Sequence, residues 1–190
     1  MEPAAFLVEL AKALNEYRFG DIRALTDHID PSGFSLSQVK KALGMMRRKR
    51  CFNDLEHAAG LFTMSGHAEP IIRRQWAQAV LDQNRVEQGL KALEDMARKV
   101  GNDPVEGPEI RGLIGRAYKQ LYVNESGPDN LRRAIASYTK DWETRTGDYR
   151  WQGINLVALV SRAQRDGVTL EELINPAQVA EALLTDRESY

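Results

Sequence analysis

The sequence holds one cysteine, no long apolar run and no excess of either charge. Cys51 has no second cysteine with which to form an internal disulfide. Charged residues interrupt every hydrophobic stretch within about ten positions, well short of the roughly 18 residues that a membrane-spanning helix needs. With 26 Lys+Arg against 27 Asp+Glu, there is no global field to attract nucleic acid or an anionic membrane. The first twenty residues also lack the pattern of a secretory signal. We therefore expect a cytoplasmic protein without membrane contact, for which nucleic acid is an unlikely partner.

The chain does have the periodicity of helices. Apolar residues recur at three- and four-residue spacing, and no segment alternates with a period of two. The predicted fold class is therefore all-α, with about ten helices. The predicted helices are Pro3–Tyr17, Phe19–Asp30, Leu36–Lys49, Phe52–Met64, Glu69–Asp82, Val86–Val100, Pro108–Val123, Asp129–Thr144, Tyr149–Arg165 and Thr169–Thr185.

Short turns between these helices predict helical hairpins, and their spacing approximates a tetratricopeptide repeat of about 34 residues. Ala77 and Gly89 lie twelve residues apart, as do the paired small residues of that repeat, and Pro104 follows. We predict a right-handed solenoid forming a single helical-repeat domain over 1–190. It would comprise degenerate N-terminal hairpins (1–66), a tetratricopeptide-like core (67–167) and a C-terminal capping helix (168–190), since solenoids need capped ends.

Three sequence blocks are more specific: GRAYKQLY from Gly115, AIASYTKDWE from Ala134, and YRWQGINLVAL from Tyr149. In this order they resemble the tetratricopeptide regulatory domain, or TRAF-binding domain, of the apoptosis signal-regulating kinases and its bacterial relatives. The resemblance implies a regulatory module that receives activating partners, or that accompanies signalling or defence effectors and senses nucleotide-derived ligands. No kinase motif is present, so the resemblance implies no catalysis.

In tetratricopeptide hairpins the first helices line a concave groove. With Gly115 at repeat position 8, Arg116 and Lys119 lie one helical turn apart on the groove face, beside the space left by Gly112. Cations, an amide and aromatic rings there would suit a carboxylate, a phosphate or a nucleotide-like ligand. The candidate groove residues are Arg74, Gln78, Arg116, Lys119, Tyr149, Trp151 and Asn155. The alternative is ordinary surface charge, in which Arg116 and Lys119 are solvated or paired with Glu109 or Asp148.

Other motifs favour structural roles. The basic run from Arg47 to Arg50 complements a helix dipole at a helix C-terminus, and no aromatic residues interleave it as a nucleic-acid patch would require. Cys51 and His57 would point to different sides of one helix, which argues against a metal site or a thiol nucleophile. Trp76 and Trp142 are expected in the core, whereas Trp151 fits a core or a surface role equally well.

The sequence thus predicts a non-enzymatic regulatory or sensor module without a cofactor or a metal. Its groove would bind an anionic or nucleotide-derived ligand, or a protein segment, and would control an associated effector domain. The alternative is a protein scaffold or oligomerisation module without a small ligand. Ligand binding to the folded state would separate the two hypotheses, because it raises the melting temperature.

Overall fold

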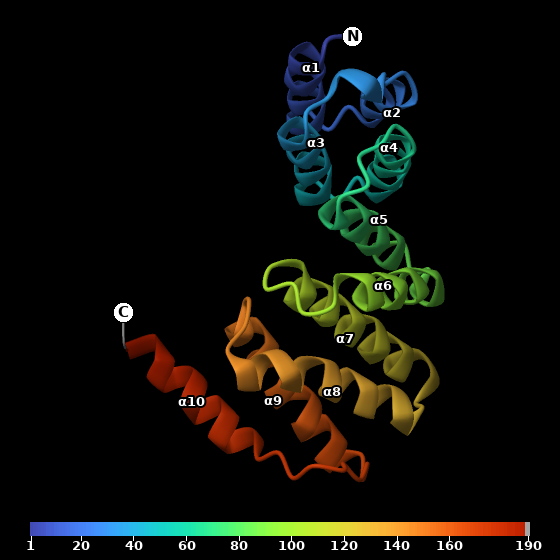
Figure 1. Cartoon of the computed structure of the whole chain (residues 1–190). Helices are drawn as coiled ribbons and strands as arrows, with labels where there is room; N and C mark the ends of the chain where they lie inside the picture. Colours follow the sequence, from blue (N-terminus) through green and yellow to red (C-terminus); the bar gives the residue numbers. More distant parts are fainter. Residues whose placement is uncertain (189–190) are drawn as a thin grey trace. The chain divides into compact units, whose positions relative to one another are not determined.

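The computed structural model describes residues 1–188, which divide into two compact units, the first spanning Met1–Gly89 and the second beginning at Leu90 (Figure 1). The predicted all-α, tetratricopeptide-like fold class is confirmed: the described residues form ten α-helices and one short 3-10 helix, with no strand. The division into one domain with three parts stays a prediction, and the last two positions of the predicted capping region lie outside the described residues. The elements are α1 (Pro3–Asn15), α2 (Phe19–Asp27), η1 (Pro31–Gly33), α3 (Leu36–Arg48), α4 (Phe52–Met64), α5 (Pro70–Asp82), α6 (Val86–Val100), α7 (Glu106–Glu125), α8 (Pro128–Thr144), α9 (Tyr149–Arg165) and α10 (Pro176–Glu188).

The first unit is built on one turn used three times. Tyr17, Arg50 and Asn84 have φ angles of 56°, 60° and 62°, and they follow one another at intervals of 33 and 34 residues. After each, a backbone N–H donates to the carbonyl five residues earlier, which is the hydrogen bond of a Schellman motif. These bonds are Arg18 to Ala13 (2.9 Å), Cys51 to Met46 (3.0 Å) and Arg85 to Val80 (3.2 Å). The backbone of this unit therefore repeats with the tetratricopeptide period, although the sequence of its hairpins matches the repeat pattern only weakly.

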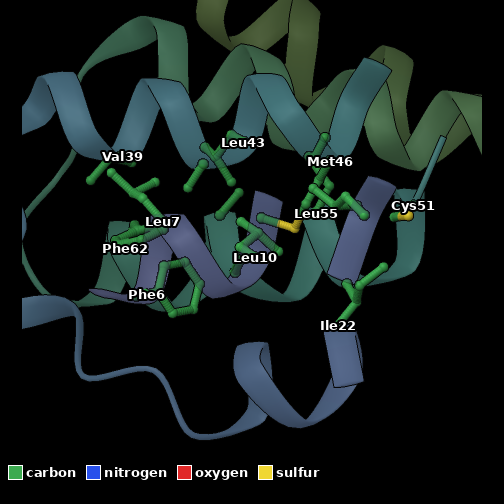
Figure 2. Close-up of a cluster of buried hydrophobic side chains, with 14 of the residues drawn as sticks. Phe6, Leu7, Leu10, Ile22, Val39, Leu43, Met46, Cys51, Leu55 and Phe62 are labelled. Atoms are coloured by element: carbon green, nitrogen blue, oxygen red, sulfur yellow. The ribbon is translucent and has the colours of Figure 1, made fainter. Parts of the chain in front are cut away.

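A continuous apolar core fills this first unit (Figure 2). Phe34 joins Phe6 and Phe62 through edge contacts, with ring centroids 5.4 and 5.1 Å away. Leu10 and Leu43, one repeat apart, are both fully buried. Since burial of such side chains is the main favourable term in folding, the equivalent helices of successive hairpins are held together by equivalent residues.

The second unit packs α7 on α8, α8 on α9 and α9 on α10. Its one fully buried carboxylate among the described residues, Asp141 on α8, accepts hydrogen bonds from Arg111 on α7, 3.0 Å from Nε and 2.5 Å from Nη2. The hydroxyl of Thr146 donates to the same carboxylate at 3.0 Å. This ion pair ties α7 to α8, because a buried carboxylate needs both a countercharge and hydrogen bonds.

The prediction of a helix from Thr169 is wrong at its start. Residues 169–175 are not helical, and α10 begins at Pro176. Proline favours an extended residue before it and suits the first turn of a helix. The side chain of Asn175 then accepts a 2.9 Å hydrogen bond from the backbone N–H of Ala177 and so caps α10.

Smaller corrections concern other helix ends, including that of α1, which was predicted to reach Tyr17 but ends at Asn15. The helix expected to reach Asp30 ends at Asp27, and the one expected to begin at Pro108 begins at Glu106. Asp103 accepts hydrogen bonds of 2.8 Å from the backbone N–H groups of Val105 and Glu106, which fixes this earlier start of α7. Across residues 1–188, no helix combines the length and apolarity that crossing a membrane requires.

Candidate functional site

Five of the seven predicted groove residues belong to the second unit, on α7 and α9. Arg116 and Lys119 project from α7, while Tyr149, Trp151 and Asn155 belong to the first half of α9. The start of α9 is set by Asp148, whose side chain accepts a hydrogen bond of 3.3 Å from the backbone N–H of Trp151.

Trp151 is held between α7 and α8 but stays accessible. Its indole meets the ring of Tyr138 edge to face, with centroids 5.6 Å apart, and it remains 40% exposed. A Cβ atom on Gly112 would lie 2.6 Å from the indole, so this close approach requires glycine. The ring is thus fixed in position and available to a ligand, as a stacking platform would be.

Lys119 and Asn155 meet across the two helices. The ammonium of Lys119 donates a 3.1 Å hydrogen bond to Oδ1 of Asn155, while Nδ2 of Asn155 donates to the backbone carbonyl of Trp151 at 2.9 Å. Burial lowers the pKa of Lys119, and the positive charge of Arg116 lowers it further. Two cations and an oriented amide therefore share one face beside the indole.

Below this face lies a buried phenol, Tyr138, to which the sequence pattern assigned no role at the site. Tyr138 is fully buried, and its hydroxyl makes no hydrogen bond among the described residues. Burial raises its pKa, which the charge of Arg116 partly opposes. The ring packs 2.8 Å from where a Cβ on Gly115 would lie, so Gly115 allows α7 and α8 to pack closely. An unpaired buried hydroxyl beside a guanidinium is an unmet hydrogen-bonding group at the site.

A second unmet group lies nearby on α9. Gln152 is 2% exposed, and its Nε2 donates to the carbonyl of Pro108 at 3.2 Å. Its Oε1 has no partner within residues 1–188. Nε2 also lies 3.0 Å from where a Cβ on Gly112 would be, which places Gln152 next to Trp151 and Gly112.

Tyr149 lies in a separate cluster at the turn between α8 and α9. Its ring is 6.2 Å from that of Trp142, and the guanidinium of Arg145 lies 3.8 Å from the Trp142 ring and 5.0 Å from the Tyr149 ring. Trp142 is 8% exposed, which confirms its predicted place in the core. Tyr149 therefore stabilises the start of α9, and its role towards a ligand stays a prediction.

The remaining two candidates, Arg74 and Gln78, lie on α5 in the first unit. Arg74 is 8% exposed, and Gln78 accepts a long 3.5 Å hydrogen bond from Nη1 of Arg47 on α3. Since these residues belong to the other unit, one groove holding all seven residues stays a prediction. Helical periodicity did not predict this contact, which joins residues 31 positions apart on different helices.

The described residues offer little that would serve metal or thiol chemistry. Within the described part of the chain, no three His, Cys, Asp or Glu side chains are grouped so that they could hold a metal ion. Cys51 is buried, and burial raises the pKa of its thiol. It therefore stays protonated at neutral pH, which is unfavourable for a nucleophile.

Comparisons with known proteins give one match. A family model described as Tetratricopeptide Repeats-Sensor matches residues 37–160. Searches of curated proteins and of solved structures each found no match. The matched segment includes α7, α8 and most of α9, and so all the residues around Lys119 and Trp151. Because the match covers well over half of the 190 residues, the chain belongs to the Tetratricopeptide Repeats-Sensor family.

Proposed function

We propose that the chain is a non-enzymatic sensor module, and that the face shared by α7 and α9 binds an anionic group. The observation that favours this is the pairing of Lys119 with Asn155 beside Arg116. Burial lowers the pKa of Lys119, and the positive charge of Arg116 lowers it further, so an anion next to Lys119 would stabilise its charged form.

The surroundings favour a ligand with a flat ring as well as a negative charge. Trp151 offers an anchored and exposed indole, and indoles stack on aromatic rings. A nucleotide-derived ligand combines phosphate charge with a stackable base, and it fits these features better than a simple anion does.

Binding would be read out by an associated effector. The family description supports a sensor role, and the resemblance to the TRAF-binding domain of the apoptosis signal-regulating kinases supports control of a neighbouring protein or domain. A ligand that prefers one arrangement of the attached parts would shift the population towards that arrangement.

Thermal unfolding with a panel of nucleotides, and with acidic peptides as the comparison, tests the proposal. A ligand at about 100 times its Kd should stabilise the fold by about 2.7 kcal/mol. Arg116→Ala and Lys119→Ala should each abolish this shift, while Lys140→Ala, which removes an exposed cation from α8, should retain it. Full ligand binding by both groove variants, with the fold intact, would refute the proposal.

A scaffold without a small ligand is the second candidate. Exposed apolar side chains favour it, notably Ile154 at 60% and Leu184 at 63% exposed, on the packed pair α9 and α10. Light scattering after size-exclusion chromatography would detect self-association, and Ile154→Ser should reverse it. A monomer that responds to nucleotides would exclude this candidate in favour of the sensor.

A further inference from the structure

The turn edge of the first unit brings aromatic rings and cations together in a way that the sequence does not show. Tyr17 and Phe19 follow α1, and their ring centroids are 6.4 Å apart. Lys49 follows α3, and its ammonium lies 4.7 Å from the centroid of the Tyr17 ring. Because the two turns are one repeat apart, residues distant in the sequence become neighbours at this edge.

Both rings are unusually accessible. Tyr17 is 61% exposed and Phe19 is 59% exposed. Two large rings at one place on the surface exceed the scattered single apolar side chains that need no explanation. They are available to stack on a planar group.

Two residues at this edge adopt an energetically unfavourable backbone conformation. Tyr17 and Arg50 occupy the left-handed region, which a bulky residue rarely adopts, whereas Asn84 fills the equivalent turn position with a residue that tolerates it. A strained position that presents an exposed side chain is a reason to look for a function.

The charge at this edge is basic. Arg47, Arg48 and Arg50 are exposed, and Lys49 is half-buried beside Tyr17. Arg47 donates a long hydrogen bond to Gln78 on α5, and the guanidinium of Arg50 lies 5.9 Å from the ring of Phe52. Arg18 forms ion pairs with Glu16 and Asp21, so the positive charge of this edge comes from the cations of the α3–α4 turn. No aromatic residue interleaves these cations in the sequence, but the fold brings Tyr17 next to Lys49, and Phe19 next to Tyr17.

We propose that this aromatic and basic edge, formed by Tyr17, Phe19 and residues 47–50, binds single-stranded nucleic acid. Unpaired bases would stack on the two rings, and phosphates would contact the four cations. The ligand class follows from the chemistry, since single strands are bound by stacking platforms lined with cations and without base-specific contacts. This site is independent of the α7 and α9 face.

The test uses the full chain with fluorescently labelled 20-nucleotide oligothymidylate and oligouridylate, followed by anisotropy at several salt concentrations. With about four phosphate contacts, a plot of log affinity against log salt should have a slope of about −3. Tyr17→Asn should weaken binding about tenfold by removing one stacking ring. Arg50→Asn should reduce the slope by about 0.7.

Asparagine is chosen because Asn84 shows that it fits this turn, so these two variants should fold normally by circular dichroism. Phe19→Ser provides a second loss of a ring at the first position of α2. Val8→Ala and Arg73→Ala are the matched controls, since they remove an exposed apolar group and an exposed cation from α1 and α5. Both controls, and Lys119→Gln in the other unit, should bind as the unaltered chain does.

Three results would overturn the proposal. One is no binding of either oligonucleotide at low salt. Another is unchanged binding by both Tyr17→Asn and Arg50→Asn. The third is equal competition by a polyglutamate peptide or by vesicles rich in anionic lipid, which would assign the edge to an acidic protein surface or to a membrane.

Discussion

Lys119 on α7 donates a 3.1 Å hydrogen bond to the amide oxygen of Asn155 on α9, although Arg116 repels its charge. The amide of Asn155 is itself fixed by the carbonyl of Trp151. A lysine held in this way is ready to meet an anion without further ordering, which reduces the entropy lost on binding.

Replacing this lysine should change the stability of the fold in a way that depends on pH. Lys119→Gln removes the repulsion by Arg116, so the free energy of unfolding should rise slightly at pH 7, by about 0.2–0.5 kcal/mol as for other like-charged neighbours. Because the pKa of Lys119 is lowered in the folded state, the unaltered chain binds fewer protons when folded and gains stability as pH rises towards the ordinary lysine pKa. Thermal unfolding should therefore show a smaller difference in stability between Lys119→Gln and the unaltered chain at pH 10 than at pH 7. A variant clearly less stable at pH 7 would contradict this account.

The closeness of α7 and α8 can be tested at Gly115. A Cβ there would lie 2.8 Å from the ring of Tyr138, so Gly115→Val should destabilise the fold by about 1–3 kcal/mol through overpacking. Gly60 on α4 has no atom within 4 Å of the equivalent point, so Gly60→Ala should stabilise by about 0.5–1 kcal/mol through helix propensity. Urea unfolding measures both. Equal effects of the two changes would show that packing at Gly115 is looser than described.

The buried ion pair gives the largest expected effect. Asp141→Ala leaves Arg111, whose side chain is 18% exposed, without its buried countercharge, and should cost about 3–5 kcal/mol. The surface pair of Arg132 and Asp129 provides the control. Asp129→Ala should change stability by less than about 1 kcal/mol, because Asp129 is 86% exposed. Denaturant midpoints of the two variants should differ clearly, and similar midpoints would show that Asp141 does not tie α7 to α8.

Acid sensitivity should depend on Asp166, at the end of α9. The hydroxyl of Tyr122 donates to this carboxylate at 2.5 Å and Arg162 pairs with it, so its pKa is well below the ordinary range. A carboxylate with a lowered folded pKa stabilises the fold above its unfolded pKa of about 3.9, and this stabilisation is lost as the pH falls. Asp166→Asn should therefore be less stable than the unaltered chain at pH 7, with the gap closing below about pH 4. Melting temperatures across pH 3–7 would show this, and a gap that does not vary with pH would exclude the carboxylate as its cause.

The sequence predicted the fold well where periodicity and turn residues agree. The helices Phe52–Met64, Val86–Val100 and Tyr149–Arg165 begin and end where apolar spacing and turn residues place them. It failed at residues 169–175, where apolar spacing continues but Pro176 restarts the helix. The family match begins at residue 37 and leaves out the first hairpin, whose turn at Tyr17 nevertheless has the geometry of the later ones.

The candidate site was predicted only in part. Helical spacing placed Arg116 and Lys119 on one face, and the repeat register added Asn155. The unpaired hydroxyl of Tyr138 could not be predicted, because the sequence does not show which donors and acceptors the neighbouring helices place around it. Contacts such as that of Lys49 with Tyr17 join residues whose approach depends on the stacking of hairpins, which local patterns do not encode.

The three equivalent turns at Tyr17, Arg50 and Asn84 are closed by backbone hydrogen bonds, so their side chains have no part in the closure. A phenol, a guanidinium and an amide occupy the same structural position without altering the hairpins that follow. Each of these three turn residues can therefore be substituted separately without altering the helices on either side. It is the natural place to introduce a label, a crosslinker or a new recognition group into this chain.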